Sequence, residues 1–243
     1  MGREMIDTPS NSVHFVTLHL RDYGVFLGSN ELNFNRHQTL IVGIGGTGKT
    51  TIVNALAQLG PEISIKANIQ AKLPDMSVEV VTKGNRDLIK IYDTIIFLSF
   101  ESTDLSWWFN QKHKFTLLNY ESLESVRSEA KEIFQTMLHR KSGGKDLKPS
   151  IMAAGERVCL GYAFTFAVRK VLNLDLPVVL DSPYGRIDSE KRQAVRAFLK
   201  DQPCQQILLG SELEFDKEDK PHYVLDYTKG YSRAIKTMCD DRL

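Results

Sequence analysis

The chain has 243 residues, of which 42% are hydrophobic and 25% charged, and a formal net charge of +1. This is the composition of an ordinary globular protein, and the length suffices for one domain with a sizeable core. A run of about 18 apolar residues, as a transmembrane helix requires, is absent from the sequence. The near-zero charge gives no general attraction to nucleic acid or membranes, so DNA binding would need a local basic patch.

The N-terminus and the cysteines indicate a reducing compartment. Residues 1–12 are polar and lack the apolar core of a signal peptide. Cys159, Cys204 and Cys239 are far apart and form no C-x-x-C pair, which argues against a zinc site. We therefore expect a cytoplasmic protein without membrane contact, in which Cys159 is a core residue.

Short strands and turns are predicted before residue 100. Alternating apolar and polar residues over 13–20 indicate a strand. A turn at 28–30 leads to a second strand, so a hairpin precedes the apolar strand at 39–42. Residues 76–92 read as another hairpin with its turn at 83–85. The predicted strands are residues 13–20, 32–34, 39–42, 76–81, 88–92 and 94–100.

Residues 43–50 read G-I-G-G-T-G-K-T, a complete G-x-x-x-x-G-K-[ST] loop. An apolar strand precedes it and a helical pattern over 50–59 follows, the context that this motif requires. The glycines let backbone N–H groups face phosphates, and the helix N-terminus adds a favourable dipole. The alternative is a glycine turn without a ligand. We predict a nucleoside triphosphate site made by Gly43, Gly45, Gly46, Thr47, Gly48, Lys49, Thr50 and Thr51.

Two residues of this loop have more specific expected roles. Lys49 would reach the β- and γ-phosphates, and the Thr50 hydroxyl would hold Mg²⁺.

The middle of the chain is less informative. Residues 107–109, W-W-F, favour a core or partner contact over a base-stacking platform. A charged amphipathic helix is predicted over 121–140, before the flexible segment 141–145. The DNA-contact candidates there are Arg140, Lys141, Lys145 and Lys148, although their composition favours a solvated loop over DNA contact.

Strands and helices alternate after Pro149. Helices are predicted over 155–172 and 189–199, and strands over 176–181 and 206–209. This alternation indicates a parallel sheet covered on both faces. Residues 223–227 are predicted to be an edge strand.

Residues 177–181, P-V-V-L-D, form a Walker-B pattern. A buried strand of this kind delivers a carboxylate, here Asp181, to the sheet edge, where it orients Mg²⁺ and its water. Alone the pattern is weak, but three other segments accompany it. They are M-A-A-G-E-R at 152–157, S-P-Y-G-R-I-D at 182–188 and Q-I-L-L-G-S at 206–211.

In this order the segments resemble the ABC-type ATPase heads of SMC-like DNA proteins, a group that includes SbcC and RecF. The closest pattern is that of the DndD family of DNA phosphorothioate modification systems. That family carries a motif like LSAGER … PxxxDTPLGRLDS, and this chain has MAAGER … PVVLDSPYGRIDS. The resemblance covers roughly residues 13–60 and 150–227.

The resemblance implies an α/β P-loop NTPase fold: an ABC-ATPase head with a mixed sheet, an N-terminal antiparallel lobe and a small helical lobe. The expected single domain spans 1–243. Within it, 13–100 form the phosphate-loop lobe, 101–150 a helical insert in place of a coiled coil, and 151–243 the signature and Walker-B lobe. About 100 residues separate the phosphate loop from the signature segment, and they contain neither heptads nor a zinc-hook C-x-x-C. This leaves open a naturally compact head or a longer protein whose coiled coil has been removed.

In such families two heads sandwich two ATP molecules, which implies a homodimer or heteromeric heads across ATP. Ala153, Gly155 and Glu156 would lie in the signature that acts on the other head's nucleotide. Asp188, in the D-loop, would cross the interface. DNA and a DNA-processing protein are the expected further partners.

Three positions depart from the usual ATPase pattern. Ser182 replaces the glutamate after the Walker-B acid, Ala153 replaces the signature serine, and Ser211 stands at the switch histidine. Loss of a general base costs about 10²–10⁴-fold in rate, so we expect slow hydrolysis. The expected catalytic set is Lys49, Asp181, Ser182, Asp188 and Ser211.

Several assignments stay open at this point. Glu212 or Asp188 could replace the lost base, and Glu101 and Gln111 are candidates for the Q-loop residue. A nucleotide sensor with little hydrolysis that recruits a partner remains an alternative. A transporter-type nucleotide-binding subunit is another, although LSGGQ, the catalytic glutamate and the switch histidine are missing.

Overall fold

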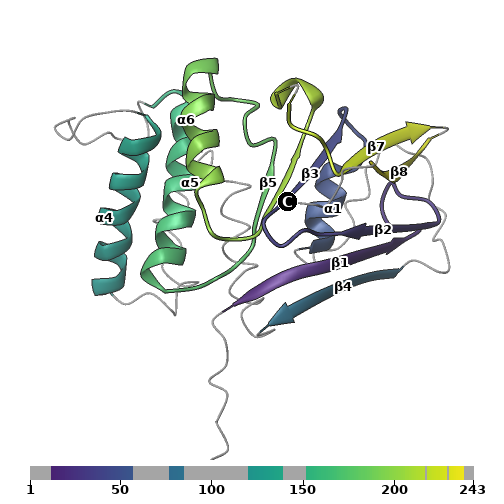
Figure 1. The fold of residues 1–243 in the computed structure, drawn as a ribbon, viewed down its shortest axis with the longest axis horizontal. Helices are drawn as coiled ribbons and strands as arrows, with labels where there is room; N and C mark the ends of the chain where they lie inside the picture. The colour runs from purple at the N-terminus through teal and green to yellow at the C-terminus, as the bar shows by residue number, and fades with distance from the viewer. Residues whose placement is uncertain are drawn as a thin grey trace, which may run out of the picture.

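The computed structural model describes residues 12–56, 77–84, 120–138, 152–216, 218–228 and 230–237. These residues form two sheets and four α-helices (Figure 1). The strands are β1 (Val13–Arg21), β2 (Ser29–Asn33), β3 (Gln38–Gly43), β4 (Ser77–Gly84), β5 (Val178–Asp181), β6 (Gln206–Gly210), β7 (Tyr223–Thr228) and β8 (Tyr231–Lys236). The α-helices are α1 (Lys49–Leu56), α4 (Tyr120–Met137), α5 (Ala154–Val171) and α6 (Ser189–Lys200); a 3₁₀ turn, η2, spans Glu212–Glu214.

The first sheet is antiparallel, in the order β2-β1-β4. A bulge between Phe15 and Thr17 shifts the β1–β4 register. Because of this extra residue, Phe15 and Leu18 are both buried although they are three positions apart, which in a regular strand would place them on opposite faces. The predicted first hairpin is confirmed, with β2 already beginning at Ser29, inside the expected turn. The turn expected at 83–85 is wrong for Lys83 and Gly84, which continue β4 and pair with β1.

The second sheet has the order β5-β6-β3-β7-β8 and is parallel except for β8. Its central strands are buried on both faces, which explains their unbroken apolar runs. Ile41 and Leu209 belong to the core cluster that contains α1, whereas Leu40 and Leu208 belong to the cluster that contains Cys159 and Tyr162 of α5. The expected parallel sheet with covered faces is therefore confirmed for β3, β5 and β6.

The predicted edge position of residues 223–227 is wrong. β7 lies between β3 and β8, and Tyr223 is fully buried, with its hydroxyl hydrogen-bonded to the backbone of Asn33. β8, Y-S-R-A-I-K, is the outer strand, and it was missed because its polar residues hide the strand pattern. Its antiparallel pairing makes the sheet mixed, as the expected fold class requires.

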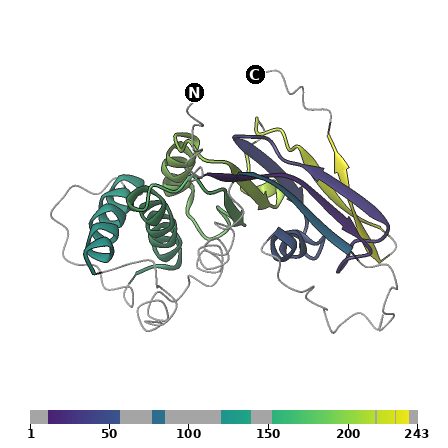
Figure 2. The same cartoon turned by 90° about the horizontal axis from the view of Figure 1, so that it is seen from below.

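Three helices form one side of the molecule. Figures 1 and 2 show α4, α5 and α6 grouped together, away from the antiparallel sheet, with α1 close to the strands. The middle of α5 is buried almost completely, so its sequence is apolar around the whole helix. α4, α5 and α6 confirm the three helices predicted over 121–140, 155–172 and 189–199.

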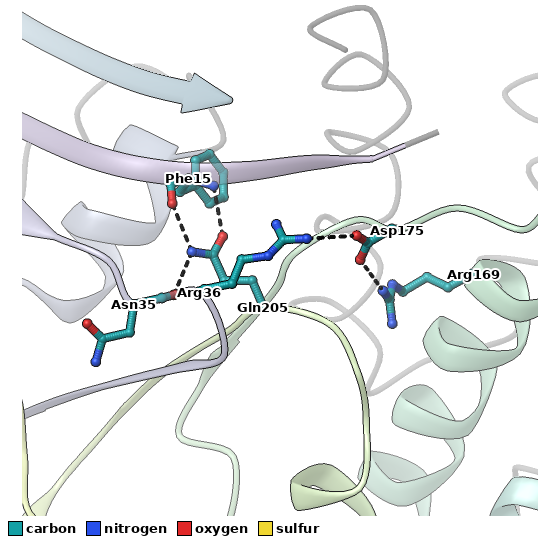
Figure 3. Close-up of polar contacts among 6 residues, drawn as sticks. All are labelled: Phe15, Asn35, Arg36, Arg169, Asp175 and Gln205. Atoms are coloured by element: carbon teal, nitrogen blue, oxygen red, sulfur yellow. Dashed lines mark hydrogen bonds and ion pairs between the residues drawn. The ribbon is translucent and has the colours of Figure 1, made fainter. Parts of the chain in front are cut away.

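A buried glutamine joins the two sheets (Figure 3). Gln205 Oε1 accepts a hydrogen bond from Phe15 N at 2.8 Å, and its Nε2 donates to Phe15 O and Asn35 O, both at 2.8 Å. Beside it, Asp175 pairs with Arg36 at 3.3 Å and with Arg169 at 3.7 Å. These contacts fix β1 against the edge where β5 and β6 begin.

Several predictions concern residues outside the described ranges: the strands at 88–92 and 94–100, the aromatic cluster at 107–109, Glu101, Gln111 and the basic segment 140–148. Within the part of the chain that the structure describes, no helix is long and apolar enough to cross a membrane.

Candidate nucleotide-binding site

The phosphate loop connects the end of β3 to the start of α1. Gly48 has a φ of +97°, and a Cβ there would lie 2.6 Å from Val25 Cγ2, so only glycine fits. A Cβ at Gly43 would lie 2.4 Å from Thr47 Oγ1. Thr47 is buried and donates its hydroxyl hydrogen to Ile44 O at 2.8 Å. Its side chain therefore supports the loop from inside.

The remaining loop residues leave space for a ligand. A Cβ at Gly45 or Gly46 would meet no atom within 4 Å. Lys49 Nζ donates to Gly43 O at 2.7 Å and to Ile44 O at 2.9 Å, so the ammonium lies across the loop. Phosphate oxygens can accept from the same donor. Thr51, by contrast, is buried against Gly24.

The structure brings Thr50 and Asp181 together. Thr50 Oγ1 donates to Asp181 Oδ2 at 3.0 Å. Asp181 Oδ1 is buried and accepts no hydrogen bond from the described residues. Burial raises the pKa of Asp181, against the lowering effect of the Thr50 hydrogen bond and the Lys49 charge. A buried carboxylate oxygen without a donor, next to a hydroxyl, fits a hard cation with oxygen ligands. Thr50 and Asp181 are therefore suited to hold Mg²⁺.

Ser182 follows Asp181 in a left-handed backbone conformation, with a φ of 50°. Such a conformation is uncommon for a non-glycine residue and marks local strain. Its N–H donates to Leu209 O at 2.7 Å, which joins the ends of β5 and β6. The Ser182 side chain is exposed at this edge.

The signature residues lie against the loop that follows Asp181. Ala153 precedes α5, and its N–H donates to Glu156 Oε2 at 3.1 Å, which caps the helix. A Cβ at Gly155 would lie only 2.7 Å from Arg186 O. The glycine thus lets the start of α5 approach the loop backbone.

Asp188 begins α6. Its carboxylate accepts from Lys191 N at 3.0 Å and pairs with Lys191 Nζ at 2.7 Å. These two hydrogen bonds lower the pKa of Asp188. A carboxylate with a lowered pKa is a weak proton acceptor, so the geometry gives Asp188 a capping role.

A glutamate that the motifs did not indicate, Glu214, is buried at the end of the 3₁₀ turn η2 that follows β6. Glu214 Oε1 accepts from Ser211 N at 3.1 Å and from Ser211 Oγ at 3.2 Å, and Oε2 accepts from Tyr184 N at 3.4 Å. Glu212, the acid considered from the sequence, is exposed. The spacing Ser211-x-x-Glu214, typical of a capping box, was the signal that could have identified it.

No family model matches the sequence, and no curated protein matches it. Solved structures do match. The SMC head domain from Thermotoga maritima superposes with a TM-score of 0.57 and 16% identity, covering 93% of this chain and 100% of that one. An SMC head bound to the C-winged helix domain of ScpA gives a TM-score of 0.60 and 16% identity, covering 92% of this chain and 97% of that one.

A third match is an SMC head with an extended coiled coil, bound to the C-terminal domain of ScpA derived from Pyrococcus furiosus. Its TM-score is 0.58 at 13% identity, with 93% of this chain and 96% of that one covered. The fold is that of an SMC head domain. At these identities the likeness concerns the path of the backbone, so the expected α/β ATPase-head architecture is confirmed. The roles of side chains in this SMC head fold rest on the geometry above.

Proposed function

We propose that the chain is an SMC-like ATPase that binds ATP with Mg²⁺, hydrolyses it slowly and dimerises across it. The observation that carries this proposal is the Thr50–Asp181 hydrogen bond at 3.0 Å, which connects the phosphate loop to the Walker-B strand. The unpartnered Asp181 Oδ1 and the open space above Gly45 and Gly46 support it.

The roles of the loop residues follow from this geometry. Backbone N–H groups of residues 43–51 surround the phosphates, and Lys49 neutralises charge on the β- and γ-phosphates. Thr50 and Asp181 hold Mg²⁺, which would counter the developing charge on the phosphates. Ser182 offers no carboxylate to orient the attacking water, so turnover is slow.

The signature and the D-loop act on the nucleotide of the second head. The N-terminus of α5, at Ala153–Glu156, would face that head's γ-phosphate, where the helix dipole favours an anion. Asp188 and the Ser182–Ile187 loop would lie at the interface. The second head is another copy of this chain or a related one.

The biological setting rests on the resemblance to the DndD family. We propose a clamp or switch in DNA modification, repair or restriction of foreign DNA, working in the cytoplasm with DNA and a DNA-processing protein. Residues 1–243 act as one head in which 101–150 replace a coiled coil. Two of the similar SMC heads were solved bound to a domain of ScpA, which supports a protein partner for this head.

A nucleotide sensor is the second candidate function. The exposed Ser182 beside Asp181, together with Ala153 and Ser211 at the other two catalytic positions, supports it. Measurable hydrolysis of ATP by the purified chain, lost in Lys49→Ala, would exclude a sensor without turnover.

Sedimentation with and without ATP·Mg²⁺, beside Lys49→Ala, tests the main proposal. We expect ATP-dependent dimerisation in the parent chain and none in the variant. A chain that binds ATP yet stays monomeric at high concentration contradicts dimerisation between copies of this chain.

A further inference from the structure

The carboxylate of Glu214 lies between two loops that both border the proposed nucleotide site. Ser211 and Glu214 follow β6, whereas Tyr184 belongs to the loop after Asp181 on β5. The two strands are parallel neighbours, with Asp181 opposite Leu209. Both loops therefore start from the same edge of the sheet as the Walker-B acid.

Each oxygen of the carboxylate faces a backbone N–H, which can only donate, so both oxygens must be acceptors. Oε1 receives the N–H and the hydroxyl of Ser211, and Oε2 receives the N–H of Tyr184. An ordinary capping box needs only one acceptor oxygen, which Glu and Gln supply equally well. A glutamine at position 214 would place its NH₂ group against either the Ser211 N–H or the Tyr184 N–H, so that two donors face each other. The geometry thus distinguishes a carboxylate from an amide.

The Glu214 side chain is buried close to two glycines. Glu214 is 9% exposed. A Cβ at Gly185 would lie 3.4 Å from Oε2, and a Cβ at Gly210 would lie 3.4 Å from Cδ. One glycine of the loop after Asp181 and the last residue of β6 thus lie next to the carboxylate.

A second set of contacts keeps the same two loops together. Arg196 Nη2 donates to Glu214 O at 2.9 Å, and its guanidinium lies 4.9 Å from the centre of the Tyr184 ring. Tyr162 of α5 donates its hydroxyl hydrogen to Pro183 O at 2.9 Å. The loop after Asp181 is therefore fixed to α5, α6 and β6, and Glu214 makes its link to Ser211.

We propose that Glu214 is a positioning residue: it orients the Ser211 hydroxyl at the γ-phosphate side of the site and couples it to the Tyr184 loop. This rests on the proposed ATPase function. Gly210 pairs with Val42, the residue before the phosphate loop, and β6 lies between β3 and β5. Ser211 therefore leaves the sheet between the phosphate loop and Asp181, and the Tyr184 loop is the one expected at the dimer face. Through Glu214, a change at the γ-phosphate reaches that face along two hydrogen-bonded contacts.

Turnover at saturating ATP·Mg²⁺ and ATP affinity, measured separately on Glu214→Gln, test this role. We expect turnover to fall at least about tenfold, while the Kd for ATP changes by less than about threefold because Lys49, Thr50 and Asp181 are untouched. Glu124→Gln, the same change at an exposed ion pair with Arg127 on α4, is the control and should match the parent.

A double-variant cycle separates positioning from a general loss of stability. If Glu214 acts through the Ser211 hydroxyl, Glu214→Gln with Ser211→Ala should turn over no more slowly than Glu214→Gln alone. If the fold-losses in turnover of the two single variants multiply in the double variant, the two residues act independently, which would contradict the proposal. Should Glu214→Gln unfold at the assay temperature, Glu214→Asp keeps the charge but is one methylene too short to serve both loops; turnover equal to the parent then overturns the proposal.

The remaining outcomes are also decisive. Loss of turnover in Glu212→Gln but not in Glu214→Gln overturns the proposal in favour of the exposed acid. A parent chain that binds no ATP refutes the proposed function itself, whereas parent turnover unchanged in Glu214→Gln refutes only the role of Glu214. If the parent binds ATP without measurable turnover, the same comparison is made on its ATP-dependent dimer fraction, which Glu214→Gln should reduce.

Discussion

The hydroxyl of Thr50 donates to Asp181 Oδ2 at 3.0 Å, which connects two motifs 131 residues apart in the sequence. The contact arises because β3 and β5 flank β6 in one parallel sheet, so the residues that follow β3 and those that end β5 meet at the same edge. In open α/β sheets, ligands bind at this edge. The proposed metal position is thus a property of strand order as much as of the two motifs.

Asp181→Asn should stabilise the chain at neutral pH and strongly reduce the proposed ATP turnover. Burial raises the pKa of Asp181 above its ordinary value of 3.8, so the folded state holds the proton more tightly than the unfolded state. The contribution of Asp181 to the free energy of unfolding is fully present below its pKa in the unfolded chain. It is lost as the pH rises through its pKa in the folded chain. Asparagine avoids this loss and can still accept the Thr50 hydrogen bond.

Thermal unfolding without nucleotide, measured at pH 7 and near pH 4, checks this sign. The midpoint of Asp181→Asn should exceed that of the parent at pH 7, and the difference should shrink at the lower pH. ATP turnover should fall at least about 100-fold. A variant less stable than the parent at pH 7 would mean that Asp181 is stabilised as the charged form.

Gly155→Ala and Gly45→Ala should distinguish a glycine required for packing from a glycine that leaves space for the ligand. A Cβ at Gly155 would lie 2.7 Å from the backbone oxygen of Arg186, so the chain must shift, at about 1–3 kcal/mol. At Gly45 a Cβ meets no atom within 4 Å. We expect Gly155→Ala to lower the unfolding midpoint by several degrees.

Gly45→Ala should instead leave the midpoint unchanged and weaken ATP binding, because its methyl group occupies the phosphate cradle. Titration with ATP·Mg²⁺ and thermal unfolding measure the two effects. Equal stability losses in both variants would contradict this division.

The sequence predicts the elements that carry a local motif better than it predicts which strands pair. The phosphate loop, α5 and β5 were predictable because each carries its own signal: glycines at fixed spacing, an apolar helix, an apolar strand ending in an acid. The inner position of β7 was not, because it depends on pairing with β3 and on a polar outer strand, β8. Strand order is a tertiary property that the period of side chains does not encode.

The candidate site shows the same limit. The spacing of Ser211 and Glu214 indicates a cap, yet only the fold reveals that Tyr184 is its third donor. The left-handed Ser182 also had no signal, since glycine, the usual residue there, is absent. Both features are produced by packing between segments distant in sequence.

Ser182→Gly should stabilise the fold. Glycine removes the strain of the left-handed conformation, which costs serine about 1–2 kcal/mol. Glycine also loses more conformational freedom on folding, which costs about 0.5–1 kcal/mol. The difference between the two is a net gain of about 0–1.5 kcal/mol. Ser189→Gly, at the start of α6, is the matched control and should destabilise, since glycine is a poor helix former. Chemical denaturation of both variants measures the contrast, and a loss in Ser182→Gly would show that the serine side chain stabilises the turn.

Gln205→Ala should give the largest stability loss among these variants. It removes the acceptor for Phe15 N and the donor for two carbonyls at a site that is 3% exposed. Leaving buried polar groups unsatisfied costs about 1–3 kcal/mol each, so we expect a loss of at least about 2 kcal/mol. Gln202→Ala, which removes only one hydrogen bond, to Phe198 O, should cost about 1 kcal/mol or less.

Denaturant unfolding of the two glutamine variants, with hydrogen exchange at the Phe15 amide, decides whether Gln205 joins the two sheets. If it does, exchange at Phe15 accelerates in Gln205→Ala together with the loss of global stability. Faster exchange at Phe15 with a stability equal to that of Gln202→Ala would mean that the antiparallel sheet opens independently of the five-stranded one. The glutamine would then satisfy local backbone groups without coupling the sheets.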